Sequence, residues 1–230
     1  MKSNSHTVSE VKTDAVQQHR AATDISAENK KTIYKHILNA LIIVAIGILV
    51  NLSIRIDYSI FKEGIGEASL TETLQLVMLA GTALCFFNLS RRRPDVKHAA
   101  NLICGFFTVL IIREMDAWFD LISHGSWVYP ALLVTFIACF NAYKGGKHTI
   151  NEMAQILKTR HMNMLVGGVM LLLVFSRLYG MGSFWESVMG HNYIRDVKNI
   201  SEETMELLCY CLIALGAAKT RFEMISKHHD

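Results

Sequence analysis

The chain has 230 residues, of which 51% are hydrophobic and only 19% are charged, and its formal net charge is +3. Soluble domains carry about 25% charged residues, so this composition does not favour a single water-soluble core. The small net charge argues against nucleic-acid binding, which needs a basic face. The five cysteines form no disulfide framework in a chain of this length. The composition therefore predicts a membrane protein.

Apolar runs divide the chain into a tail and six predicted membrane spans. Residues 1–31 are polar, so we expect a disordered cytoplasmic tail there. A helix needs roughly 20 largely apolar residues to cross a bilayer core. By that criterion residues 32–220 form an all-α, polytopic membrane domain with six transmembrane helices, and residues 221–230 form a short cytoplasmic tail. The predicted spans are residues 34–54, 69–90, 99–122, 127–143, 162–182 and 203–219.

The ends of these spans carry further signals. Ser201 is the expected N-cap of the sixth helix, with Glu202 and Glu203 in its first turn. Gly167 and Gly168 in the fifth helix are expected to allow a close helix approach or a bend. Residues 144–161 are read either as a short amphipathic helix on the inner leaflet or as a solvated connector.

The distribution of Lys and Arg between the loops predicts the orientation. One set of segments is rich in both residues, whereas the opposite set holds only Arg55, Lys62, Arg195 and Lys198. Because cytoplasmic loops carry an excess of Lys and Arg, both termini are expected in the cytoplasm. Three tryptophans fall at the outer ends of their helices, as an interfacial aromatic belt requires. These are Trp118, Trp127 and Trp185.

Ionisable residues within membrane spans are costly unless they are paired, so they mark the candidate site. They concentrate at the outer ends of the second, third, fifth and sixth helices, which also bring Gln75, Ser176 and Tyr210. In a continuous third helix, Arg113, Asp116, Asp120 and His124 would share one polar stripe about 80° wide. The predicted binding cluster consists of Glu72, Arg113, Glu114, Asp116, Asp120, Arg177, Glu203 and Glu206.

Three interpretations of this cluster stay open. It is an ion-pair network that joins helices, a catalytic or metal site, or part of a proton- or ion-coupled transport path. In the second case Asp116 or Asp120 is the acid/base, and His124 and His191 are the candidate ligands of a divalent cation. No HExxH motif is present, and no other cofactor is predicted. The absence of acids from the inner halves argues against a continuous transport path.

Several segments resemble an uncharacterised group of bacterial inner-membrane proteins of similar length. The segments are residues 176–180 (SRLYG) with Trp185, residues 195–199 (RDVKN), Glu202 and Glu203, residues 206–208 (ELL) with Tyr210, residues 62–67, and residues 113–116 (REMD). The resemblance covers most of residues 55–218. It implies a multi-pass protein of the bacterial inner membrane, and it implies no activity and no catalytic residue.

The sequence thus favours a ligand-recognising or accessory membrane protein of unspecified activity. One alternative is a membrane-embedded enzyme that acts on a lipid-linked or envelope substrate, with Arg177 holding an anionic group. A second alternative is a transporter that uses Asp116 and Glu206 as proton carriers. The expected partners are the lipid bilayer and a further membrane protein or a second copy of the chain, and no nucleic acid.

Overall fold

A computed structural model describes residues 26–61 and 69–226 of the chain. Most of the predicted tail (1–25), the acidic segment of the resemblance (62–67) and the last four residues lie outside the described residues. The chain divides into two compact units, residues 1–45 and 46–230. The described part of the first unit is the N-terminal part of one long helix, with exposed apolar side chains that include Ile33, Leu41 and Val44.

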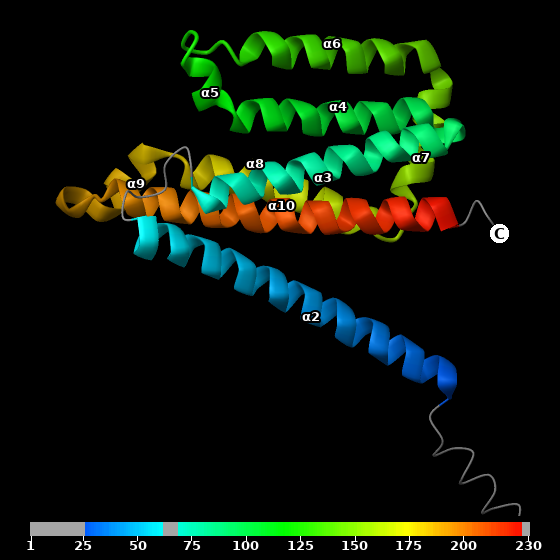
Figure 1. Ribbon diagram of the computed structural model, residues 1–230, viewed down its shortest axis with the longest axis horizontal. Helices are drawn as coiled ribbons and strands as arrows, with labels where there is room; N and C mark the ends of the chain where they lie inside the picture. The colour runs from blue at the N-terminus through cyan, green and yellow to red at the C-terminus, as the bar shows by residue number, and fades with distance from the viewer. Residues whose placement is uncertain (1–25, 62–68, 227–230) are drawn as a thin grey trace, which may run out of the picture. The chain divides into compact units, whose positions relative to one another are not determined.

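Every regular element in the described residues is a helix, as the sequence predicts (Figure 1). The α-helices are α2 (Ala27–Ile56), α3 (Leu70–Arg92), α4 (Lys97–Glu114), α5 (Asp116–Asp120), α6 (Val128–Gly145), α7 (Lys147–Leu157), α8 (Met162–Tyr179), α9 (Gly182–Met189) and α10 (Arg195–Ser226). Short π- or 3-10 segments are η1 (Asp57–Phe61), η2 (Pro94–Val96) and η3 (Gly190–Asn192). Helix α7 lies in the connector for which a short helix was one of two predictions.

Four of the described helices are long and apolar enough to cross a bilayer, which indicates a membrane protein. They are Ala27–Ser59, Leu70–Arg92, Pro94–Glu114 and Met162–Tyr179. The other two predicted spans are also helical, as α6 and α10, but they are not among these four. Helix α6 ends with Asn141 and Lys144, and α10 carries charged residues at both ends.

Helix boundaries differ from the predictions at both ends of the chain. Helix α2 begins at Ala27, so the last residues of the predicted disordered tail are helical. Helix α10 begins at Arg195 and ends at Ser226, beyond both limits of the sixth predicted span. The prediction that Ser201 is an N-cap is wrong, because its hydroxyl lies within the helix and donates to the Val197 carbonyl. Polar turns thus extend this helix past its apolar part.

The third predicted helix is interrupted, so its polar stripe is not continuous. Helix α4 ends at Glu114, and Met115 has φ −98° and ψ 16°, outside helical values. Asp116 then accepts a hydrogen bond from the amide of Ala117 at 2.7 Å and begins the separate helix α5. Such local bonds between a carboxylate and the backbone compete with helix continuation. Asp116 and Asp120 therefore follow α5 rather than the axis of α4.

Within the second unit the helices form a row of packed neighbours. Helix α10 packs against α8 and α3, α3 packs against α4, and α4 packs against α6. Figure 1 shows α4 lying between α6 and α3. Helices α8 and α10 approach closely at Gly168, where a Cβ would lie 2.8 Å from the Ile213 side chain. This agrees with the prediction for Gly168, whereas Gly167 has open space around it.

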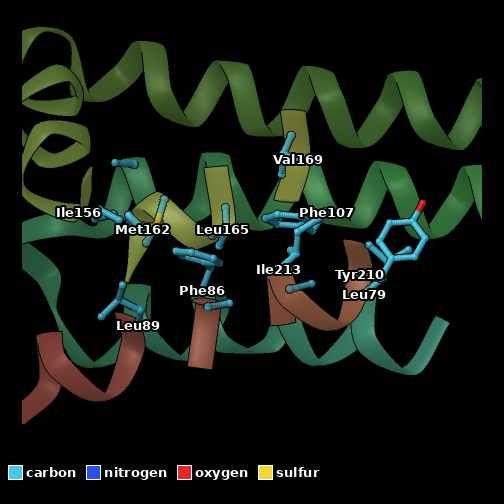
Figure 2. Close-up of a cluster of buried hydrophobic side chains, with 14 of the residues drawn as sticks. Leu79, Phe86, Leu89, Phe107, Ile156, Met162, Leu165, Val169, Tyr210 and Ile213 are labelled. Atoms are coloured by element: carbon cyan, nitrogen blue, oxygen red, sulfur yellow. The ribbon is translucent and has the colours of Figure 1, made fainter. Parts of the chain in front are cut away.

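The main core lies between α3, α4, α8 and α10. Figure 2 shows Phe86, Phe107, Leu165 and Ile213 pointing toward one another from these four helices. The rings of Phe86 and Phe107 are stacked, with centroids 6.3 Å apart. Tyr210 lies at one end of this core, with its hydroxyl pointing away from the apolar side chains. The core therefore gives way to polar groups at that end of the bundle.

Buried acids from other elements cap the N-termini of two helices. Asp57 is fully buried and accepts hydrogen bonds from the amides of Leu70 and Thr71 at the start of α3, at 2.8 and 3.0 Å. Glu152 on α7 accepts from the amide of Ala99 and contacts His98 Nδ1, both at 2.9 Å, at the start of α4. The free amides of a helix N-terminus favour such carboxylates.

The environment of Glu152 changes its acidity. Burial raises the pKa of Glu152, but hydrogen bonds from His98 and from the backbone outweigh burial, so the pKa lies below its usual value of 4.5. A depressed pKa in the folded state means that the ionised carboxylate stabilises the fold. This contribution is present above pH 4.5 and is lost as the pH falls through the lower folded-state pKa.

We therefore expect Glu152→Gln to lower the free energy of unfolding by about 1–2 kcal/mol at pH 7, the usual cost of losing a helix cap. Unfolding of the full chain in detergent measures this effect. The difference from the original protein should shrink as the pH falls below 4.5. Glu186→Gln, at an exposed position of α9, is the control and should have little effect. Equal stability of the Glu152 variant and the original protein at pH 7 would contradict the capping role.

Candidate functional site

The candidate site lies where the C-terminal ends of α4 and α8 meet the first half of α10. Its centre, here called the polar cluster, consists of Arg113, Glu114, Ser176, Glu206 and Tyr210. Arg113 and Glu114 are the last residues of α4, Ser176 is near the end of α8, and the other two belong to α10. The helix packing therefore joins residues that lie up to 97 positions apart in the chain.

Glu206 is the most buried acid of the polar cluster, with only 4% of its surface exposed. Its Oε1 accepts a hydrogen bond from the Ser176 hydroxyl and lies 3.5 Å from Arg113 Nη2. A buried carboxylate is tolerated only when donors and opposite charge replace its lost water. The two donors come from α8 and α4, so Glu206 links three helices.

Glu114 is the second carboxylate of the polar cluster. Its Oε1 accepts a hydrogen bond from the hydroxyl of Tyr210 at 2.7 Å and also contacts the guanidinium of Arg113. Tyr210 is completely buried, so this bond satisfies its one polar group. Arg113 thus contacts both carboxylates, and no other ion pair to them occurs in residues 26–61 and 69–226. Arg113 therefore holds the two carboxylates close together at this end of the bundle.

A second pair of polar residues extends this region toward α3. Gln75 is buried, and its Nε2 donates to Glu203 Oε2 at 2.7 Å. Glu203 precedes Glu206 by one turn of α10, and Glu72 precedes Gln75 by one turn of α3. Glu72 is half-buried, and its amide donates to the Ser69 hydroxyl that caps α3. The acids of α3 and α10 therefore lie on the end of the bundle that holds the polar cluster.

An open pocket of about 210 Å³ adjoins the polar cluster. Its lining consists of Arg113, Ser176, Arg177, Gly180, Met181 and Glu202. Glu202 is already paired with Lys198, whose Nζ lies 2.8 Å from the carboxylate. The exposed guanidinium of Arg177 makes no hydrogen bond or ion pair with any described residue. The pocket thus presents Arg177, which the described residues leave without an ion pair, and Arg113, whose side chain is 43% exposed.

Gly180 keeps the pocket open at the end of α8. A Cβ at this position would lie 2.9 Å from the carbonyl oxygen of Ser176 and would also collide with the carboxylate of Glu202. Real Cβ atoms essentially never approach a backbone oxygen so closely. A larger residue would therefore shift Glu202 and the last turn of α8, which carry part of the pocket lining.

The structure brings together most, but not all, of the predicted site residues. Arg113, Glu114 and Glu206 are in contact, and Arg177 lines the adjoining pocket. Glu203 lies one turn before Glu206 on α10 and accepts a hydrogen bond from Gln75 of α3. The acids Asp116 and Asp120 are exposed on α5 and line no part of this pocket. The separation follows from the break at Met115, since α5 no longer continues the direction of α4.

Asp120 forms a local arrangement of its own. It accepts from the amide of Gly125 at 2.7 Å, and His124 Nδ1 lies 2.9 Å from its other oxygen. The Gly125 bond and the contact with His124 hold the pKa of Asp120 below its usual value. A lowered pKa keeps this carboxylate ionised, which suits ion pairing better than the role of a general acid.

The predicted metal ligands are not brought together. His124 contacts Asp120, whereas His191 lies in η3 and is exposed. In the part of the chain that the structure describes, no group of three or more His, Cys, Asp or Glu residues is arranged to hold a metal ion. The carboxylates of the polar cluster are bonded to Ser176, Tyr210 and Arg113 instead.

Sequence reasoning placed Ser176, Tyr210 and Glu202 near the site but did not include them among the candidates. Ser176 is directly adjacent to Arg177 in the sequence. Tyr210 follows Glu206 by one helical turn and therefore lies on the same face of its helix. That spacing is the signal that identifies them. Gly180 and Met181 have no such signal, because their role depends on how α8 meets α10.

Compared with protein-family models, with characterised proteins and with solved structures, the chain has no match.

Removing the Tyr210 hydroxyl tests whether the polar cluster stabilises the bundle. Tyr210→Phe keeps the buried ring but leaves Glu114 without this donor, so we expect a loss of about 0.5–2 kcal/mol in the free energy of unfolding. Unfolding of the full chain in detergent measures the loss. Tyr129→Phe is the matched control, because Tyr129 is 77% exposed and should tolerate the change. Equal stability of the two variants would show that the Tyr210–Glu114 bond contributes nothing.

Proposed function

We propose that this protein recognises an anionic ligand in the pocket between Arg113 and Arg177. It does so as a six-span protein of a bacterial inner membrane, with both termini in the cytoplasm and the pocket on the outer side. The observation that carries the proposal is the guanidinium of Arg177, which has no ion pair within residues 26–61 and 69–226 and shares the pocket with the half-exposed guanidinium of Arg113.

The orientation is supported by where basic residues lie along the helices. Arg93 and the basic residues around α7 lie near the start of α4. Arg113 lies near the other end of this helix, about 24 Å from Lys97 along the axis. Arg93 also donates to the carbonyl of Met224, near the end of α10. Because Lys and Arg favour the cytoplasmic side, the pocket belongs to the outer side.

The charges of the pocket favour an anion. Glu202 is neutralised by Lys198, and Arg113 is held by two carboxylates of the polar cluster. Arg177 therefore supplies a cation that the described residues leave uncompensated. A guanidinium presents paired N–H donors that match a phosphate or carboxylate group. An anion in the pocket would pair with Arg177 and lie beside the exposed part of the Arg113 guanidinium.

The polar cluster prepares this pocket for binding. Ser176 and Arg113 line the pocket, and both are held by Glu206 before any ligand arrives. Side chains that are already fixed lose little entropy when a ligand binds. The cluster thus acts as the support of the pocket. This favours recognition over catalysis, since Asp116 and Asp120 are not part of the lining.

Neutralising Arg177 tests the proposal. Binding of two probes, glycerol 3-phosphate and dioleoyl phosphatidylglycerol, is measured on the full chain in a zwitterionic detergent. We expect at least one probe to bind, and Arg177→Gln to weaken its binding about tenfold or more, because a charge-assisted hydrogen bond contributes roughly 1.5–3 kcal/mol.

The control is Arg92→Gln. Arg92 is exposed at the C-terminal end of α3, which is the end away from the polar cluster. Like Arg177, its side chain has no ion pair or hydrogen bond to the described residues. Its replacement removes the same charge from another part of the protein and should leave binding unchanged. Equal binding by the Arg177 and Arg92 variants, or no binding of either probe, would overturn the proposed function.

A further inference from the structure

An apolar groove lies between α4 and α8, next to the pocket described above. It has a volume of about 280 Å³, and all of its lining residues are apolar. Phe107, Leu165 and Val169 form its buried floor, whereas Phe106, Val166 and Met170 lie at its rim with 37–54% of their surfaces exposed. Helix α7 also contributes to the lining through Met153 and Leu157. The groove is thus an open apolar channel along two membrane helices.

The groove and the pocket lie on the same faces of these two helices. On α4, Phe106 of the groove is followed seven residues later by Arg113 of the pocket. On α8, Val169 and Met170 are followed seven residues later by Ser176 and Arg177. Seven residues are almost two full turns, so each pair shares a face and is separated by about 10 Å along the axis. The apolar groove therefore leads to the two arginines.

We propose that the groove and the pocket form one binding site for a single lipid with an anionic phosphate headgroup. An acyl chain lies in the groove, and the phosphate lies between Arg113 and Arg177. This inference rests on the proposed function, because it names the class of molecule that carries the anion.

Charge complementarity selects this occupant. The groove offers only apolar contacts, which any acyl chain of the surrounding bilayer satisfies. The arginines at its end discriminate among lipids, because a net-negative headgroup supplies a counter-charge that Arg177 does not receive from the part of the chain that the structure describes. A free phosphate would leave the groove without a role, and a zwitterionic lipid would bring a second cation to the arginines. A lipid with one phosphate and no cationic group fits both parts.

Filling the groove separates this inference from the proposed function. Val166→Trp places a large ring at the exposed rim on α8, and Met170→Trp is a second variant at the next turn. Leu171→Trp is the matched control, because Leu171 is 43% exposed but does not line the groove. Binding of dioleoyl phosphatidylglycerol, dioleoyl phosphatidylcholine and glycerol 3-phosphate to the full chain is measured for each variant by native mass spectrometry and by titration.

We expect the original protein to prefer phosphatidylglycerol over phosphatidylcholine. Both groove variants should bind phosphatidylglycerol roughly tenfold more weakly, the effect of losing about two methylene contacts. Leu171→Trp should bind as the original protein does.

Two results would overturn the lipid assignment while the proposed function stands. In the first, Arg177→Gln weakens binding but neither groove variant does. In the second, glycerol 3-phosphate binds as tightly as phosphatidylglycerol. A third result, groove variants that change the fraction of dimer without changing lipid binding, would assign the groove to a second copy of the chain. Binding that is insensitive to Arg177→Gln would remove the proposed function itself.

Discussion

The carboxylate of Glu206 has to be satisfied inside the bundle, and the candidate site is organised around that requirement. With 4% of its surface exposed, Glu206 has lost its water and depends on the Ser176 hydroxyl and on the guanidinium of Arg113. One donor belongs to α8 and the other to α4, so the acid on α10 holds the C-terminal ends of two neighbouring helices. The same two donors line the pocket. The cost of burying this charge is thus offset by contacts that also shape a surface for recognition.

Acids elsewhere in the second unit follow the same physical rule. Asp57 and Glu152 are buried and accept hydrogen bonds from the N-terminal amides of α3 and α4. Apolar packing between helices has little directionality, because a membrane helix gains as much from lipid tails as from leucine. Polar contacts at the helix ends therefore define where one helix begins relative to another. In this protein they set the axial positions of α3 and α4, while close approach at Gly168 sets the spacing of α8 and α10.

The helices could be predicted from the sequence because each apolar run is a local property. The meeting of Arg113, Glu114 and Glu206 could also be anticipated, since alternate helices bring their charged ends to one side. Asp116 and Asp120 were predicted to belong to the same cluster on the assumption that the third helix is continuous. The backbone of Met115 is not helical, so both acids lie on the separate helix α5. The pocket at Gly180 and the capping by Asp57 depend on contacts between distant elements, which no spacing in the sequence encodes. The sequence also does not show that α4 and α8 are neighbours, and this packing is what places the apolar groove next to Arg113 and Arg177.

The most direct test of this account is a double-mutant cycle on Ser176 and Glu206. The free energy of unfolding is measured in detergent for the original protein, Ser176→Ala, Glu206→Leu and the double variant. If Glu206 depends on the Ser176 donor, the two losses should overlap, giving a coupling energy greater than about 0.5 kcal/mol. Losses that add to within about 0.5 kcal/mol would mean that the two residues act independently. In that case Glu206 does not hold the end of α8, and the pocket lacks the support described here.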